Sequence, residues 1–166
     1  ILLSLVNSND IKPDSIEEII IEKPRAMWEV TGTEERKRPP APEVARLSSY
    51  YFAAVAVLHR EVWLSSLEPE IFNASETWEM ADKVRVVHNP DFDDDFPSAY
   101  TSRATLCLKD GRRISDEKKY PKGDPENPFS LDDLLIKVNG LYDYCFSDII
   151  SRERFDSVIE RTMSLE

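Results

Sequence analysis

The stretch TSRATLCLKDGRRISDEKK, residues 101–119, decides the fold class. Between residues 101 and 108, apolar side chains alternate with more polar ones, and this period of two is typical of a strand with one buried face. Asp110 and Gly111 then form a dipeptide that favours a tight hairpin, because glycine adopts a positive φ without strain. The stretch therefore predicts two antiparallel strands joined by a turn.

Two further strands are predicted upstream of this hairpin. Residues 15–22 form a β-branched run rich in isoleucine that Pro24 ends, and residues 84–88 alternate as a strand does. The strands thus cluster along the chain instead of alternating strictly with helices. This order favours an α+β fold, an antiparallel sheet covered by helices, over a doubly wound sheet.

Helical patterns fill most of the remaining sequence. Residues 42–64 are apolar on almost every side and predict a buried helix, and residues 75–82 predict a shorter one. Residues 120–128 contain three prolines and predict an ordered connector, in which Gly123 adopts a conformation closed to other residues. Ser130 then caps a helix that is expected to pack through Leu134, Leu135, Val138 and Leu141. A last helix is predicted from Ser151 onward.

Composition limits the classes of function. The chain has 166 residues, of which 41% are hydrophobic, and this fits a single domain over residues 1–166. Its net charge of −11 excludes the electrostatic footprint of a nucleic-acid or anionic-membrane protein, and no apolar run approaches the ~20 residues of a membrane span. Two cysteines and two scattered histidines do not make a zinc cluster, so no metal is expected. We interpret the apolar start, residues 1–6, as the end of a helix in a longer chain.

Polar side chains on the helix predicted at residues 42–64 are the candidates for a site. Ser48 and Tyr51 are three residues apart and share one face, so that with Arg46 they could line a cleft. Alternatively, the hydroxyls reach backbone carbonyls in the core, and spacing alone favours this alternative. The acidic run at residues 91–95 lacks the glycine and the bidentate glutamate of a calcium loop and is interpreted as a solvated turn. The two histidines lack a neighbouring nucleophile and are assigned no catalytic role.

Two pairs of segments resemble the MmgE/PrpD family. The first pair is ARLSSYYFAAVAVL at residues 45–58 and WEMADKVRV at residues 78–86, similar to the family's Ala-x-x-Ser-x-x-Tyr helix and the strand that follows it. The second pair is LKDG at residues 108–111 and YPKGDPENP at residues 120–128. The order and spacing of these segments agree with the family over most of the chain.

The resemblance implies a two-domain enzyme of which this chain is the smaller, C-terminal lid domain, a fragment that is inactive alone. The family comprises 2-methylcitrate dehydratase, cis-aconitate decarboxylase and iminodisuccinate epimerase, which act on small polycarboxylates without a metal or organic cofactor. Most of its catalytic bases lie in a helical N-terminal domain that is missing here. Carried over by position, Tyr51 is the expected catalytic hydrogen-bond donor, and Ser48 and Arg46 are the expected substrate-binding residues. The Tyr51 hydroxyl is therefore expected to point toward a cleft, where it is partly exposed or lacks a protein partner.

Two functions from different classes therefore stay open. One is a lid domain of a cytoplasmic lyase or isomerase whose partners are the substrate, the helical domain and, in a homo-oligomer, further copies. The other is a non-catalytic binding or interaction domain that keeps the lid fold, and the net charge of −11 favours it because anionic substrates would be repelled.

Overall fold

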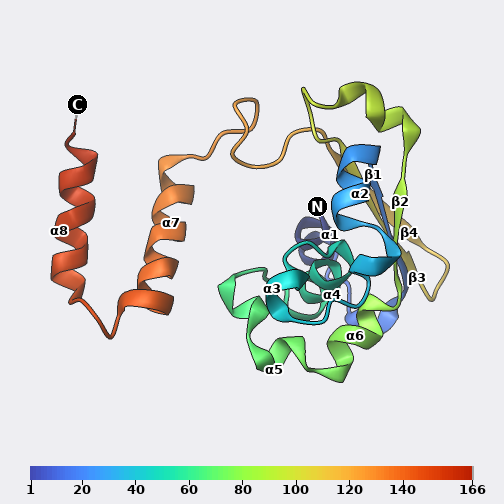
Figure 1. Ribbon diagram of the computed structural model, residues 1–166, viewed down its shortest axis with the longest axis horizontal. Helices are drawn as coiled ribbons and strands as arrows, with labels where there is room; N and C mark the ends of the chain where they lie inside the picture. The colour runs from blue at the N-terminus through green and yellow to red at the C-terminus, as the bar shows by residue number, and fades with distance from the viewer. Residues whose placement is uncertain (166) are drawn as a thin grey trace. The chain divides into compact units, whose positions relative to one another are not determined.

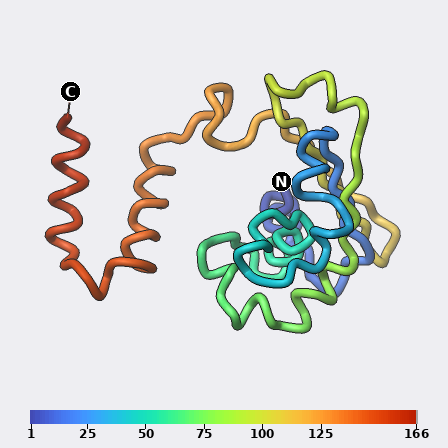
Figure 2. Tube along the Cα trace, viewed as in Figure 1, coloured from blue at the N-terminus to red at the C-terminus, as the bar shows by residue number. Residues whose placement is uncertain are grey.

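The computed structural model describes residues 1–165 and divides into two compact units, Ile1–Pro121 and Lys122 onward (Figures 1 and 2). The first unit contains all the described strands, and the second contains two of the helices. No helix among the described residues combines the length and the apolar character needed to cross a bilayer. The prediction that residues 1–166 form one domain stays a prediction.

A four-stranded sheet organises the first unit, in the order β2-β1-β3-β4. The strands are β1 (Ile16–Lys23), β2 (Val84–His88), β3 (Ser102–Leu108) and β4 (Arg113–Lys118). β3 pairs with β1 and with β4 in antiparallel fashion, and the turn between β3 and β4 places Gly111 at φ +87°. The hairpin and the α+β class are thus confirmed.

The predicted antiparallel sheet is wrong in one respect, because β1 and β2 pair in parallel, with Ile19 opposite Val84. The sheet is therefore mixed. The physical reason is the long helical connection between the two strands, which returns the chain to the sheet in its original direction.

Six helices of the first unit, several of them short, lie before and within this connection. They are α1 (Leu2–Ser8), α2 (Arg25–Thr31), α3 (Pro42–Ala45), α4 (Ser49–His59), α5 (Pro69–Phe72) and α6 (Ser75–Ala81). The single buried helix predicted at residues 42–64 is in fact two, because the chain leaves helical geometry at Ser48. Ser48 accepts a hydrogen bond from the Tyr51 N–H and so caps the start of α4.

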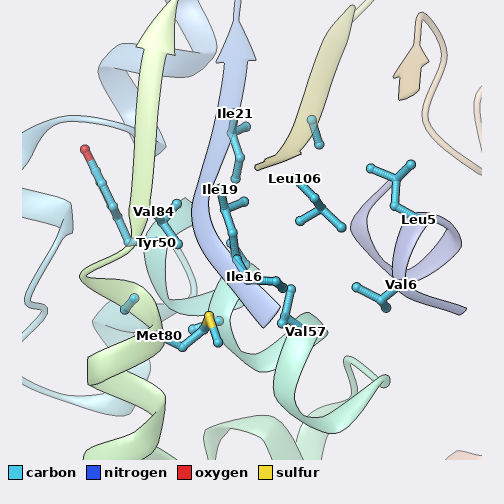
Figure 3. Packing of buried hydrophobic residues seen from close by; sticks show 14 of the residues in the cluster. Leu5, Val6, Ile16, Ile19, Ile21, Tyr50, Val57, Met80, Val84 and Leu106 are labelled. Atoms are coloured by element: carbon cyan, nitrogen blue, oxygen red, sulfur yellow. The ribbon is translucent and has the colours of Figure 1, made fainter. Parts of the chain in front are cut away.

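The main core lies between the sheet and three helices, α1, α4 and α6 (Figure 3). Ile19 and Leu106 are fully buried on the sheet, and Val6 and Val57 meet them from α1 and α4. A second, smaller cluster on another side of α4 gathers Ala45, Tyr51, Val55 and Phe72. Helix α4 is therefore covered on nearly all sides, as its apolar sequence predicted.

The second unit has little core of its own. Gly123 in the connector has φ +107°, as predicted, and α7 (Leu131–Leu141) begins at Ser130 with a capping box. A π turn (Tyr142–Phe146) follows, and α8 (Arg152–Met163) is the last helix. The predicted packing of α7 is wrong at Leu134, which is 45% exposed, because α8 and the π turn offer too little surface to cover the helix within this unit.

Candidate functional site

The three predicted site residues lie together around the break between α3 and α4. Ser48 is 2% exposed, and its hydroxyl donates a hydrogen bond of 2.5 Å to the Arg36 carbonyl while its oxygen caps α4. The Ser48 hydroxyl therefore acts both as a donor and as an acceptor of hydrogen bonds within the fold. The structure supports the alternative in which this hydroxyl serves a backbone carbonyl.

Tyr51 is buried in an aromatic cluster. Its ring lies with centroids 5.4 to 5.7 Å from those of Phe52, Phe72 and Trp78, and the side chain has no exposed surface. The hydroxyl donates a short hydrogen bond to the carbonyl of Ser66. Burial also raises the pKa of the phenol to about 12, so the hydroxyl stays protonated at neutral pH.

The expectation that the Tyr51 hydroxyl is partly exposed or lacks a protein partner is wrong. The physical reason is the 3₁₀ turn Leu64–Leu67, which brings the Ser66 carbonyl to the hydroxyl. A carbonyl that already accepts this bond fixes the phenol in the core. Tyr51 therefore has the geometry of a core tyrosine, the alternative that spacing alone favoured.

Arg46 is the member of the three that keeps free donors. The side chain is exposed, and its Nε donates a weak hydrogen bond of 3.3 Å to the Glu43 carbonyl. No carboxylate among residues 1–165 lies within ion-pair distance of its guanidinium. Since a guanidinium carries five N–H donors in a planar fork, Arg46 can still bind a carboxylate through two of them.

Lys23 is a further candidate, which was not predicted from the sequence, and it lies near Ser48 and Arg46. It is the last residue of β1, and its Nζ lies 2.8 Å from the Ser49 Oγ and 3.1 Å from the Thr31 Oγ1. Burial lowers the pKa of Lys23 to about 8, because the ammonium loses solvent without gaining a negative partner. The sequence did contain a signal, since Lys23 continues the inward-facing positions of Ile19 and Ile21 at a period of two.

Two hollows adjoin Lys23. The larger, of about 360 Å³, is lined by residues of α1, α4, β1 and β3, including Arg103. The smaller, of about 220 Å³, lies at the break between α3 and α4 and includes Arg46 and Ser48. Lys23, Ser49 and Phe52 line both hollows, so the side chain of Lys23 borders each of them.

Two of the remaining sequence candidates, His88 and the acidic run at residues 91–95, have structural partners. His88 Nε2 lies 2.7 Å from a carboxylate oxygen of Asp93, and the Arg25 N–H together with His88 holds the pKa of that carboxyl below its usual range. The acidic run forms a 3₁₀ helix (Pro90–Asp95) in which Asp95 pairs with Lys119. Within residues 1–165, no three His, Cys, Asp or Glu side chains come together as a metal site requires.

Comparison with known proteins relates the chain to one family. The model of the MmgE/PrpD C-terminal domain matches residues 1–164. Mouse (Mus musculus) cis-aconitate decarboxylase is 26% identical over 153 residues, which cover 92% of this chain and 29% of that protein. The chain thus spans less than a third of the length of this curated relative. Because the family model covers nearly every residue, the chain belongs to the MmgE/PrpD family and corresponds to its C-terminal domain.

Proposed function

We propose that this chain is the lid-like C-terminal domain of a lyase or isomerase that acts on small polycarboxylates. The observation that carries the proposal is the family match over residues 1–164. The name of the mouse relative describes the decarboxylation of cis-aconitate, which is a small polycarboxylate. Because this chain spans 29% of that relative, the reaction belongs to a longer protein, and the chain supplies one part of it.

In this proposal the reaction is divided between two domains. A base in an N-terminal helical domain, as the family resemblance implies, removes a proton next to a carboxylate of the substrate. The present domain covers the substrate, excludes water and offers positive charge to the carboxylates. Arg46 is the proposed substrate-binding residue, whereas the hydroxyls of Ser48 and Tyr51 are committed to the fold.

A binding or interaction domain without catalysis is the second candidate. The net charge of −11 favours it. The buried hydroxyl of Tyr51 favours it as well, because the hydrogen-bond donor expected of this domain is already bonded to the Ser66 carbonyl. The two candidates differ in one observable, the conversion of a polycarboxylate by the whole protein.

The test uses the full-length gene product and the 166-residue chain side by side. Each is incubated with 2-methylcitrate, with cis-aconitate and with citrate, and the reaction is followed by proton NMR, which reports dehydration, decarboxylation and isomerisation alike. We expect turnover by the full-length protein and none by the chain alone. A full-length protein that binds these compounds without converting them would favour the second candidate.

Location and assembly belong to the same proposal. We expect the full-length protein in the cytoplasm, which cell fractionation measures. Light scattering measures whether the protein is a monomer or a homo-oligomer.

A further inference from the structure

We propose that Lys23, held by Ser49 and Thr31, is a binding site for one carboxylate group of a small polycarboxylate. The chemical class of the ligand rests on the proposed function, whereas the existence of an anion site rests on the geometry around Lys23. Arg46, across the smaller hollow, would receive a second carboxylate of the same molecule.

The hydrogen bonds around Lys23 have a fixed direction. The Ser49 hydroxyl donates to the Thr31 Oγ1 at 3.1 Å, and the Thr31 hydroxyl donates to the Met27 carbonyl at 2.8 Å. Both hydroxyl hydrogens are therefore used, and both oxygens face the ammonium as acceptors. An ammonium has three N–H donors, so one donor of Lys23 stays available for a ligand.

The positive charge of Lys23 has no negative partner among residues 1–165. No carboxylate among the described residues lies within ion-pair distance of its Nζ, although the chain has 32 acidic residues against 21 basic ones. A partly buried cation without a counter-charge is costly, and such groups are enriched at sites that bind a ligand or carry out a reaction. Two hydroxyl oxygens orient the ammonium but do not neutralise it.

The charged side chains that line the two hollows are all basic. Lys23, Arg46 and Arg103 are their charged side chains, and no described residue that lines either hollow carries a carboxylate. Arg103 is already paired with Glu22 and Glu117, which leaves Lys23 and Arg46 as the charged side chains of the two hollows that form no ion pair with a described carboxylate. A different hollow at the sheet mixes Glu17, Glu18, Glu34 and Asp82 with its basic residues. The absence of acidic side chains near Lys23 is thus a local property and not one of the whole surface.

A purely structural role for Lys23 makes a different prediction. The ammonium joins β1 to α2 and α4 through two hydroxyls, and a structural link of this kind would stabilise the fold without binding any anion. Its loss would then lower the melting temperature and leave the affinity for polycarboxylates unchanged. The carboxylate site predicts the reverse, because removal of an uncompensated charge relieves its desolvation.

The experiment measures citrate binding to the 166-residue chain by isothermal titration calorimetry at neutral pH. We expect Lys23→Met to weaken the binding of citrate by about tenfold or more, the effect of losing one hydrogen bond to a charged group. Lys109→Met is the matched control, because Lys109 is exposed next to the β3–β4 turn and the variant changes the net charge equally. This control should bind citrate within about twofold of the wild type.

A second measurement does not depend on how Lys23→Met folds. The Cε signal of Lys23 in the ¹³C-lysine-labelled wild-type chain, assigned with Lys23→Arg, reports its titration with and without saturating citrate. A bound carboxylate should raise the pKa of Lys23. Inorganic phosphate serves as the second anion, and we expect it to bind more weakly than citrate.

Four outcomes would overturn the assignment to carboxylates. They are no citrate binding by the wild-type chain, equal binding by Lys23→Met, an unchanged Lys23 titration, and tighter binding of phosphate than of citrate. Failure of the proposed function would look different. It would appear as a full-length protein that binds citrate through Lys23 yet converts no polycarboxylate.

Discussion

Tyr51 lies in the first turn of α4, and the ammonium of Lys23 contacts Ser49 at the start of the same helix, yet the surroundings of the two polar groups are opposite in kind. Around Tyr51, the rings of Phe52, Phe72 and Trp78 pack against the side chain, and the Ser66 carbonyl accepts the hydrogen bond of the hydroxyl. Around Lys23, two hydroxyls accept hydrogen bonds from the ammonium, and two hollows adjoin the side chain. No carboxylate of the described residues forms an ion pair with it.

The difference separates a structural polar group from a candidate binding group. A buried hydroxyl whose hydrogen bond is complete specifies one packing arrangement and offers nothing to a ligand. A partly buried cation with an unused donor costs stability and gains it back when an anion binds. Tyr51, the residue suggested by family position, is therefore the weaker candidate, and Lys23 is the stronger one.

The largest expected effect tests the packing of the Tyr51 side chain. Tyr51→Ala should lower the free energy of unfolding by about 3–5 kcal/mol, because it leaves a cavity among three aromatic rings. Tyr100→Ala is the control, since Tyr100 is 40% exposed, and it should cost about 1 kcal/mol or less. Urea denaturation of both variants gives the two values. Equal losses would show that the cluster around Tyr51 is no better packed than the surface.

The next effect isolates the hydroxyl. Tyr51→Phe should lower the free energy of unfolding by about 1–3 kcal/mol, because the buried Ser66 carbonyl loses its partner. Tyr50→Phe is a matched comparison, since the Tyr50 hydroxyl donates to the Gly32 carbonyl at 2.9 Å and should show a similar loss. The contrary result is a full-length Tyr51→Phe enzyme with unchanged stability and turnover reduced tenfold. That result would indicate that the Tyr51 hydroxyl acts on the substrate and not in the packing of the core.

Much of the fold could be predicted from sequence because its signals are local. The β3–β4 hairpin follows from alternation and one Asp-Gly turn, and the cap of α7 follows from Ser130 and Asp133. Relations between distant segments could not be predicted in this way. The parallel pairing of β1 with β2 depends on the path of the helices between them, and the exposure of Leu134 depends on what else the unit offers to cover α7.

The candidate site could be predicted only in part, for the same reason. Spacing placed Ser48 and Tyr51 on one helix face, but it could not reveal that carbonyls from residues 36 and 66 reach their hydroxyls. Lys23 was accessible to pattern analysis, since a charge on the inward face of a strand is unusual. The meaning of that charge depends on Thr31 and Ser49, which only the folded chain brings to it.

The last effect concerns Lys23 and the pH dependence of stability. Its pKa is about 8 in the folded chain, against about 10.4 for an unperturbed lysine. Between these two pH values the unfolded chain binds more protons than the folded one, so the folded state gains stability as pH rises, by up to about 1.4 kcal/mol per pH unit. Below pH 8 both states are protonated, and the full penalty of the buried charge remains.

Lys23→Met removes this titration, so the difference in the free energy of unfolding between the variant and the wild type should depend on pH. The free energy of unfolding of the variant minus that of the wild type should be largest and constant below about pH 7 and should fall steadily from about pH 8 to pH 10. Other titrating groups cancel in the difference. Arg46 and Arg103, the other charged side chains of the two hollows, keep their charge throughout, and the Ile1 amino group, whose pKa burial lowers, is common to both proteins. Urea denaturation across this range supplies the values, and a difference that does not change with pH would mean that the ammonium of Lys23 is as well solvated as one on the surface.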